Sequence, residues 1–380
     1  MARGRAKWKK IFDLKPALGA GMAWIETKAP AFADFLRYTS LHSPVADSAI
    51  IEDIRRPLHL QDAPYIKAYQ SLQRQNVDGK NLTHQGDGVR LVTAICPSVT
   101  IHGHFMMPVD QKTHRLLALS EGRIPWGLTF PLPSPVPKRK LSGFVIALPP
   151  IKNYYHVLVD YLLPALSAIV RNPALFNKPI TLVVNAPSPA AQFIVDLLRD
   201  AGFDAGLMCL SAFETVEAEY YLFAKSSAAS TEHGYAFYPE LKSLDAFIEA
   251  RTNTIDVPEK IIIERTQTRL RNVLNQQEML DWLVKKDFVP VSFNWNNLLF
   301  QIACFRRARQ IVSVHGAALT NLCWGERGDM LEIFPDNARK TTYLHMASQN
   351  HFTYRSAFGS PEQSNQNFSV DLQQIEAALT

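Results

Sequence analysis

Residues 311–324 read IVSVHGAALTNLCW, an apolar run that ends at His315 and is followed by small residues at 316–318. Thr320 and Asn321 then open a segment with helical character. A strand, a tight turn of small residues and a helix in this order allow a ligand to reach the free N–H groups at a helix start. The alternative interpretation is that the small residues let a helix pack closely on a sheet.

Outward from this stretch, apolar strand-like runs alternate with amphipathic helical segments. Towards the C-terminus, strands are predicted at 260–265, 288–293, 310–316 and 330–334, with helices at 275–287, 296–308, 318–322 and 341–350. Towards the N-terminus, strands are predicted at 143–149 and 180–186, with helices at 154–169 and 190–203. This alternation predicts right-handed crossovers and parallel sheets covered on both faces.

The fold class is therefore α/β, with two doubly wound halves that face each other across a cleft. The halves are predicted at 141–255 and 256–380, the second with a closing helix near its end. Residues 1–140 form a mixed, partly β extension that ends in the proline-rich segment 126–140.

The composition is that of a globular protein, with 380 residues, 47% hydrophobic and 20% charged. The four cysteines lack C-x-x-C spacing, which favours a reduced, cytoplasmic setting over a zinc site or a disulfide framework. No segment has the roughly 20 consecutive apolar residues of a membrane span. No nucleic-acid motif is present, so nucleic acid is not an expected partner.

The net charge of +5 is concentrated near the N-terminus, in Arg3, Arg5, Lys7, Lys9 and Lys10. Such a cluster is compatible with an anionic substrate or with peripheral contact at an anionic membrane surface. The alternative is a solvated, frayed terminus.

Arginines follow the predicted strand at 260–265. Arg265 stands at its carboxyl end, and Arg269 and Arg271 follow in the next loop. Guanidinium groups in this position can clamp phosphate oxygens, whereas the alternative is a solvated basic loop. Glu332, at the end of another strand, can accept hydrogen bonds from ribose hydroxyls or pair with one of these arginines.

His156 and Asp160 are four residues apart in a predicted helix, which places them on one face. A histidine oriented by a carboxylate is a candidate general base. The alternative is an ordinary surface or capping pair.

Two motifs are absent from the sequence. No D-x-D triplet occurs, so the predicted site has no metal and a bound diphosphate would be neutralised by arginine and a helix start. No G-x-G-x-x-G fingerprint occurs, which weakens a dinucleotide interpretation. No cofactor is expected.

Four stretches of the sequence resemble, in the same order, the motifs of glycosyltransferase family 61. They are NYYHVLVD (153–160), IIIERTQTRLRNVLN (261–275), HGAALTN (315–321) and LEIFP (331–335). The resemblance covers about 141–358. It differs from the family pattern at Val157, where a tryptophan is usual, and at Ala318, where a second glycine is usual.

The resemblance implies a GT-B-type fold of two Rossmann-like domains, with an acceptor domain at 141–255 and a nucleotide-sugar donor domain at 256–380. It implies an inverting, metal-independent transfer from a UDP-linked donor to a glycan or glycolipid acceptor, in a bacterial enzyme of surface polysaccharide synthesis. The implied roles are donor diphosphate binding by Arg265, Arg271, His315, Gly316, Ala317, Ala318, Thr320 and Asn321, ribose binding by Glu332, and catalysis by His156 and Asp160.

Two other classes fit parts of the pattern. One is a different nucleotide-dependent α/β enzyme, such as an epimerase or dehydrogenase, which the missing glycine fingerprint disfavours. The other is a module that binds a nucleotide-sugar or a glycan without turnover. Binding without turnover would distinguish it from a transferase.

Overall fold

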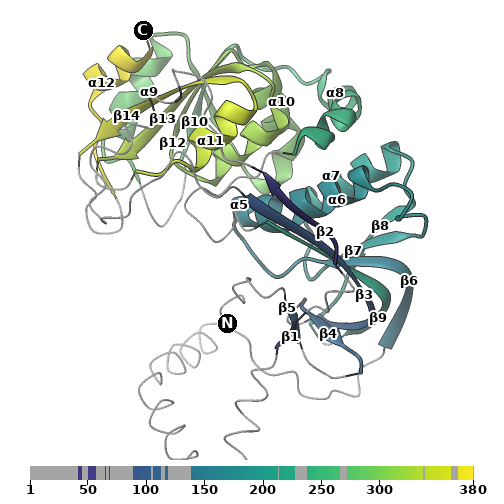
Figure 1. Cartoon of the computed structure of the whole chain (residues 1–380). Helices are drawn as coiled ribbons and strands as arrows, with labels where there is room; N and C mark the ends of the chain where they lie inside the picture. The colour runs from purple at the N-terminus through teal and green to yellow at the C-terminus, as the bar shows by residue number, and fades with distance from the viewer. Residues whose placement is uncertain are drawn as a thin grey trace, which may run out of the picture.

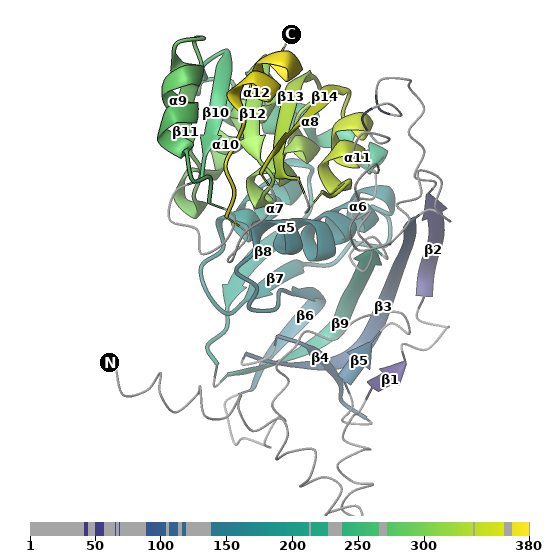
Figure 2. The same ribbon diagram turned by 90° about the vertical axis from the view of Figure 1, so that its left-hand side faces the viewer.

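The computed structural model describes residues 42–44, 50–56, 65, 68, 89–103, 106–112, 116–118, 138–212, 214–226, 238–265, 272–336, 339–360 and 367–379. These residues form a mixed α/β structure with two sheets. Several helices lie between the sheets, as two perpendicular views show (Figures 1 and 2). The cluster at 3–10 and its proposed membrane contact lie outside the described residues.

The second sheet is entirely parallel. Its strands are β10 (Lys260–Glu264), β11 (Val289–Ser292), β12 (Gln310–Val314), β13 (Gly328–Pro335) and β14 (Phe352–Gly359). They are arranged as β11-β10-β12-β13-β14, and each neighbouring pair is parallel. The order reverses between β10 and β12, and ligands of open α/β sheets bind at such a reversal, beyond the carboxyl ends of the strands.

Helices cover both faces of this sheet. They are α9 (Gln276–Val284), η5 (Trp295–Asn297), α10 (Leu298–Arg307), η6 (Ala317–Trp324), α11 (Thr342–Gln349) and α12 (Leu372–Leu379). Alternation along β10 explains the two layers, because Ile262 packs with α9 and α12 while Ile261 and Ile263 pack with α10, η6 and α11. The predicted closing helix is α12, and it contacts β14.

The first sheet is mixed. Its strands are β1 (His42–Pro44), β2 (Ile50–Arg56), β3 (Val89–His102), β4 (Pro108–Asp110), β5 (Leu116–Ala118), β6 (Lys138–Ala147), β7 (Ile180–Val184), β8 (Ala205–Cys209) and β9 (Thr215–Ser226). They are arranged as β1-β5-β4-β3-β9-β6-β7-β8, with β2 also on β3. The pairs among β9, β6, β7 and β8 are parallel, as predicted for β6 and β7, whereas β3 runs antiparallel to β9.

The antiparallel pairing of β3 with β9 has a consequence for the chain's organisation. Strands from the first 140 residues belong to the same sheet as the strands after them, and β6 itself begins at Lys138. The predicted domain boundary at residue 140 therefore falls within a continuous sheet. The division of the chain into domains stays a prediction.

The helices of this half are α5 (Tyr154–His156), η2 (Val157–Leu162), α6 (Leu163–Arg171), α7 (Pro189–Asp200), η4 (Pro239–Leu244) and α8 (Asp245–Thr252). They pack on the face of β6 that carries Phe144 and Ile146. On the opposite face, Val145 and Ala147 pack with residues of β3, and no helix among the described residues contributes to that cluster. Described helices therefore cover one face of this sheet, not both.

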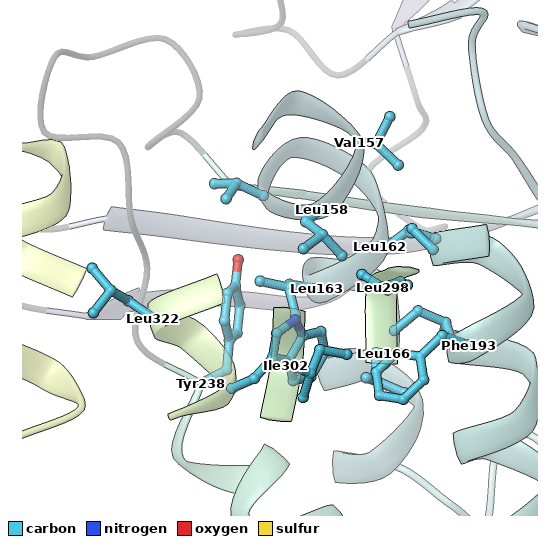
Figure 3. Close-up of a cluster of buried hydrophobic side chains, with 14 of the residues drawn as sticks. Val157, Leu158, Leu162, Leu163, Leu166, Phe193, Tyr238, Leu298, Ile302 and Leu322 are labelled. Carbon is cyan, nitrogen blue, oxygen red and sulfur yellow. The ribbon is translucent and has the colours of Figure 1, made fainter. Parts of the chain in front are cut away.

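A single apolar core joins the two halves. Leu158, Leu163 and Leu166 of the first half lie beside Ile302 and Leu322 of the second (Figure 3), and each of these side chains is at most 1% exposed. Burial of an aliphatic side chain of this size stabilises a fold by about 1.5–3 kcal/mol. The packing therefore fixes η2 and α6 against the second sheet's helices.

None of the helices in the described part of the chain is both long and apolar enough to cross a membrane.

Candidate active site

The order reversal of the second sheet brings Arg265 and His315 together. Arg265 directly follows β10, and His315 directly follows β12. The Nη1 atom of Arg265 donates a hydrogen bond to the backbone carbonyl of His315 over 2.7 Å. A guanidinium is thereby held at the carboxyl edge of the sheet, where a phosphate ligand of such a fold binds.

Gly316 explains why the turn needs a small residue. Its backbone is extended, with φ −178° and ψ 169°, so any residue could adopt it. A β-carbon at this position, however, would lie 2.5 Å from Nη1 of Arg265. The group that comes close to the backbone of this turn is thus the guanidinium.

The helix after the turn begins earlier than predicted. It is the 3₁₀ helix η6, which starts at Ala317, so Thr320 and Asn321 lie inside it and are 0% exposed. Ala317 and Ala318 are half-buried, and the methyl group of Ala318 packs against the core between the sheets.

Both the oxygen and the nitrogen of the Asn321 side-chain amide form hydrogen bonds with protein groups. Its Oδ1 accepts a hydrogen bond from the Tyr154 hydroxyl over 2.7 Å. Its Nδ2 donates to Oε1 of Gln301 over 3.1 Å and to the carbonyl of Ala318 over 3.0 Å. Asn321 therefore links α5 to η6, a role that its position in the sequence did not reveal, and its contact with a diphosphate stays a prediction.

Glu332 lies beneath the turn and is 0% exposed. Its Oε1 is 2.5 Å from Nδ1 of His315, and its Oε2 accepts a hydrogen bond from the Tyr354 hydroxyl over 2.6 Å. Glu332 therefore pairs with His315. The alternative of a pair with Arg269 or Arg271 lies outside the described residues. Ribose binding by Glu332 stays a prediction, and a ribose hydroxyl would have to compete with these two bonds.

Tyr354 was not identified as a site residue from the sequence. It lies on β14, a strand that was not predicted, and it is 4% exposed. Burial, together with the neighbouring Glu332 carboxylate, raises the pKa of its hydroxyl well above the usual value. The hydroxyl therefore stays protonated and can donate to the carboxylate. The signal for this strand in the sequence was the alternation of apolar or aromatic residues, such as Phe352 and Tyr354, with polar ones.

His156 and Asp160 meet as predicted, at the start of the helix that follows β6. The Asn153 side chain caps this helix by accepting from the N–H of Tyr155 over 3.0 Å. His156 Nδ1 and Asp160 Oδ2 are 2.9 Å apart, with side chains 45% and 17% exposed. The hydrogen bond to Asp160 raises the pKa of His156, although partial burial and Lys340 oppose the change.

Asp160 lies in a wider stretch of that helix. Residues Val157–Leu162 form a π-helix, in which the N–H of Leu163 bonds to the carbonyl of Leu158. Pro164 explains the widening, because it has no N–H for the carbonyl four residues earlier and its ring would clash with that carbonyl.

Aromatic rings connect the two histidines across the halves. Ring centroids are 5.3 Å apart for His156 and Tyr155, 6.1 Å for Tyr155 and Tyr343, and 5.2 Å for Tyr343 and His315. Phe334 also stacks on His315, with ring centroids 5.1 Å apart. A histidine–carboxylate pair from each half thus belongs to one continuous set of contacts.

Arg269 and Arg271 lie outside the described residues, so the role of Arg271 at the diphosphate stays a prediction. Among the residues that the structure does describe, no group of three or more histidine, cysteine, aspartate or glutamate side chains is placed to hold a metal ion.

The family model described as Glycosyltransferase 61 matches residues 154–331. The match contains the pair His156 and Asp160, and it also contains Arg265 and His315 at the order reversal of the second sheet. This part of the chain is a glycosyltransferase family 61 domain. The protein is therefore a glycosyltransferase, with a sugar donor and an acceptor as its partners. No curated protein matches the chain.

Proposed function

We propose that this glycosyltransferase moves a sugar, with inversion, from a nucleotide-sugar donor to a hydroxyl of a glycan or glycolipid acceptor. The proposed donor is UDP-linked, and the proposed transfer needs no metal. The supporting observation is the position of a histidine–carboxylate pair in one half and an arginine-lined turn in the other, connected through Tyr155 and Tyr343.

The donor diphosphate is assigned to the turn between β12 and η6. Arg265 is already held there by the His315 carbonyl, which reduces the rotamer freedom that it would lose on binding a phosphate. The N–H groups at the start of η6 add partial positive charge. Arg271 completes the proposed site from the neighbouring loop.

The acceptor is assigned to the side of His156. In an inverting transfer the acceptor oxygen attacks the anomeric carbon from the face opposite the diphosphate. The new glycosidic bond forms as the bond from the anomeric carbon to the phosphate oxygen breaks, and the diphosphate leaves with the electron pair. His156 takes the hydroxyl proton, while Asp160 orients the ring through Nδ1.

The proposed assignment of the two substrates to different halves corresponds to a GT-B-type arrangement, with an acceptor domain at 141–255 and a donor domain at 256–380. The parallel order of the second sheet supports the donor half, and β9-β6-β7-β8 supports the acceptor half. A place at the cytoplasmic face of a membrane, with the basic N-terminus at the lipid surface, is part of the same proposal.

The experiment is a thermal-shift titration of the purified protein with UDP, GDP and CMP, each with and without EDTA. A ligand that binds only the folded state raises the unfolding midpoint by mass action. We expect a shift with UDP that survives EDTA and is lost in Arg265→Ala. A shift that EDTA abolishes would contradict metal independence, and an unchanged shift in Arg265→Ala would contradict the donor site.

A further inference from the structure

Glu332 is a carboxylate in the middle of a parallel sheet. It lies on β13 between Ser313 of β12 and Ser356 of β14, and its neighbours Ile333 and Phe334 are fully buried. Removal of a carboxylate from water costs several kcal/mol unless hydrogen bonds compensate for the lost hydration. Here the compensating groups are the His315 ring and the Tyr354 hydroxyl.

The geometry leads to one arrangement of hydrogen bonds. The Tyr354 hydroxyl donates to one carboxylate oxygen of Glu332, and the other oxygen lies within hydrogen-bond distance of Nδ1 of His315. An ionised carboxylate only accepts, so the proton between the two residues belongs to Nδ1. The ring also contacts the rings of Phe334 and Tyr343.

We propose that Tyr354 and Glu332 form a relay that fixes the orientation and the Nδ1–H tautomer of His315, so that both are positioning residues for donor binding. The expected effect of the relay on donor binding rests on the proposed function. Its expected effect on the tautomer of His315 does not. The relay assigns Glu332 a role behind the turn in place of direct contact with a ribose.

A purely structural role predicts something different. If Tyr354 only filled space, replacement by phenylalanine would preserve the ring, its packing and the state of His315. If the relay operates, loss of the Tyr354 hydroxyl changes the tautomer of His315, although Tyr354 reaches that ring only through Glu332. A readout of the tautomer therefore separates the two possibilities.

The experiment combines Tyr354→Phe and Glu332→Gln with Tyr221→Phe as the control. Tyr221 is also buried, but it belongs to the first sheet, on the face packed with β3. Nitrogen-15 NMR of labelled histidine reports the tautomer of each ring, and His315→Gln identifies the signal of His315. The affinity for UDP, with EDTA present, is measured by calorimetry.

We expect the Nδ1–H tautomer at His315 in the wild type and in Tyr221→Phe. In Glu332→Gln and Tyr354→Phe, the Nε2–H form should increase, with UDP affinity about tenfold weaker for the first and about threefold weaker for the second. An unchanged His315 signal in a folded Tyr354→Phe protein would overturn the relay, whatever the behaviour of Glu332→Gln.

The two proposals fail differently. If the wild type binds no UDP but the tautomer responds to Tyr354→Phe, the relay stands and the donor assignment is wrong. If UDP binds and Arg265→Ala abolishes binding, but the tautomer and the affinity ignore both relay variants, the donor site stands and the relay is wrong.

Discussion

The guanidinium of Arg265 lies against the α-carbon of Gly316, so closely that a β-carbon there would be 2.5 Å from Nη1. The contact joins the carboxyl ends of β10 and β12, the two strands where the order of the second sheet reverses. Because Gly316 has an extended backbone, space and not conformational freedom accounts for the glycine. The smallest residue of the turn thus determines where its cation lies.

Gly316→Ala should displace this guanidinium. The clash involves the end of a flexible side chain, so the change in unfolding free energy should stay within about 1 kcal/mol. The value of kcat/KM should fall by roughly tenfold to a hundredfold, because a displaced cation stabilises the leaving diphosphate less well. Steady-state kinetics and urea unfolding measure the two effects.

Gly206→Ala is the matched control, since a β-carbon at Gly206 would meet nothing within 4 Å. This variant should keep both activity and stability. Full activity of Gly316→Ala would show that the contact with Arg265 has no part in transfer.

The raised pKa of His156 predicts a pH dependence of activity. As a base, His156 must be neutral, so activity should rise with pH along a limb centred above the ordinary value of 6.5. Asp160→Asn should move this limb to lower pH and reduce kcat, because the hydrogen bond to Asp160 is the main cause of the raised pKa. Lys340→Gln should move it to higher pH, because Lys340 lowers that pKa. A limb unaffected by Asp160→Asn would exclude His156 as its origin.

The same pair predicts a small pH dependence of stability. A pKa raised by folding stabilises the protein below the unfolded-state value of 6.5, and this contribution is lost as pH rises through the folded-state value. Because His156 is 45% exposed, the contribution should be below about 1 kcal/mol. Urea unfolding of wild type and Asp160→Asn should therefore differ more at pH 5.5 than at pH 9, since those two conditions lie on either side of the titration.

Local spacing was sufficient to predict the contact of His156 with Asp160, because residues four apart on a helix are neighbours whatever surrounds them. The contact of Glu332 with Tyr354 depends on the pairing of β13 with β14, and the second of these strands was not predicted. The antiparallel pairing of β3 with β9 is long-range as well, so the local pattern that predicts a partly β extension cannot show which strand that extension joins.

The start of η6 was misplaced for a different physical reason. Thr320 and Asn321 look like capping residues in isolation, and polar side chains are favoured at helix starts. In the folded protein the Tyr154 hydroxyl and Gln301 bond the Asn321 amide, so that it can be buried. Both partners come from elsewhere in the chain, beyond the reach of a local pattern.

Tyr154→Phe tests how the halves are held together. The change removes the hydroxyl that donates to Asn321 and leaves a fully buried amide oxygen without that bond. The free energy of unfolding should fall by about 1–3 kcal/mol. Phenylalanine keeps the ring that packs edge-on against Trp295, whereas Tyr154→Ala removes it as well and should cost more. Equal losses in the two variants would assign the effect to the hydroxyl alone.

Arg171→Met tests whether β2 is held against α6. Arg171 reaches Glu52 of β2 over 2.5 Å and Glu240 of η4 over 2.6 Å, and all three side chains are less than 20% exposed. Loss of the cation leaves two carboxylates partly buried, which should reduce the free energy of unfolding by about 3–5 kcal/mol. Lys178→Met is the control, because its ion pair with Glu219 is exposed to solvent and should contribute little to stability.

The penalty of Arg171→Met should also depend on pH in a defined direction. Burial raises the pKa of Glu52, but hydrogen bonds from Arg171 and Asn172 outweigh it, so the pKa is lowered from 4.5. The stabilisation is therefore present above pH 4.5 and is lost as pH falls through the lower folded-state pKa. Urea unfolding of wild type and Arg171→Met should differ fully at pH 7 and much less at pH 3. A difference that is the same at both pH values would mean that the ion pair is not what Arg171 contributes.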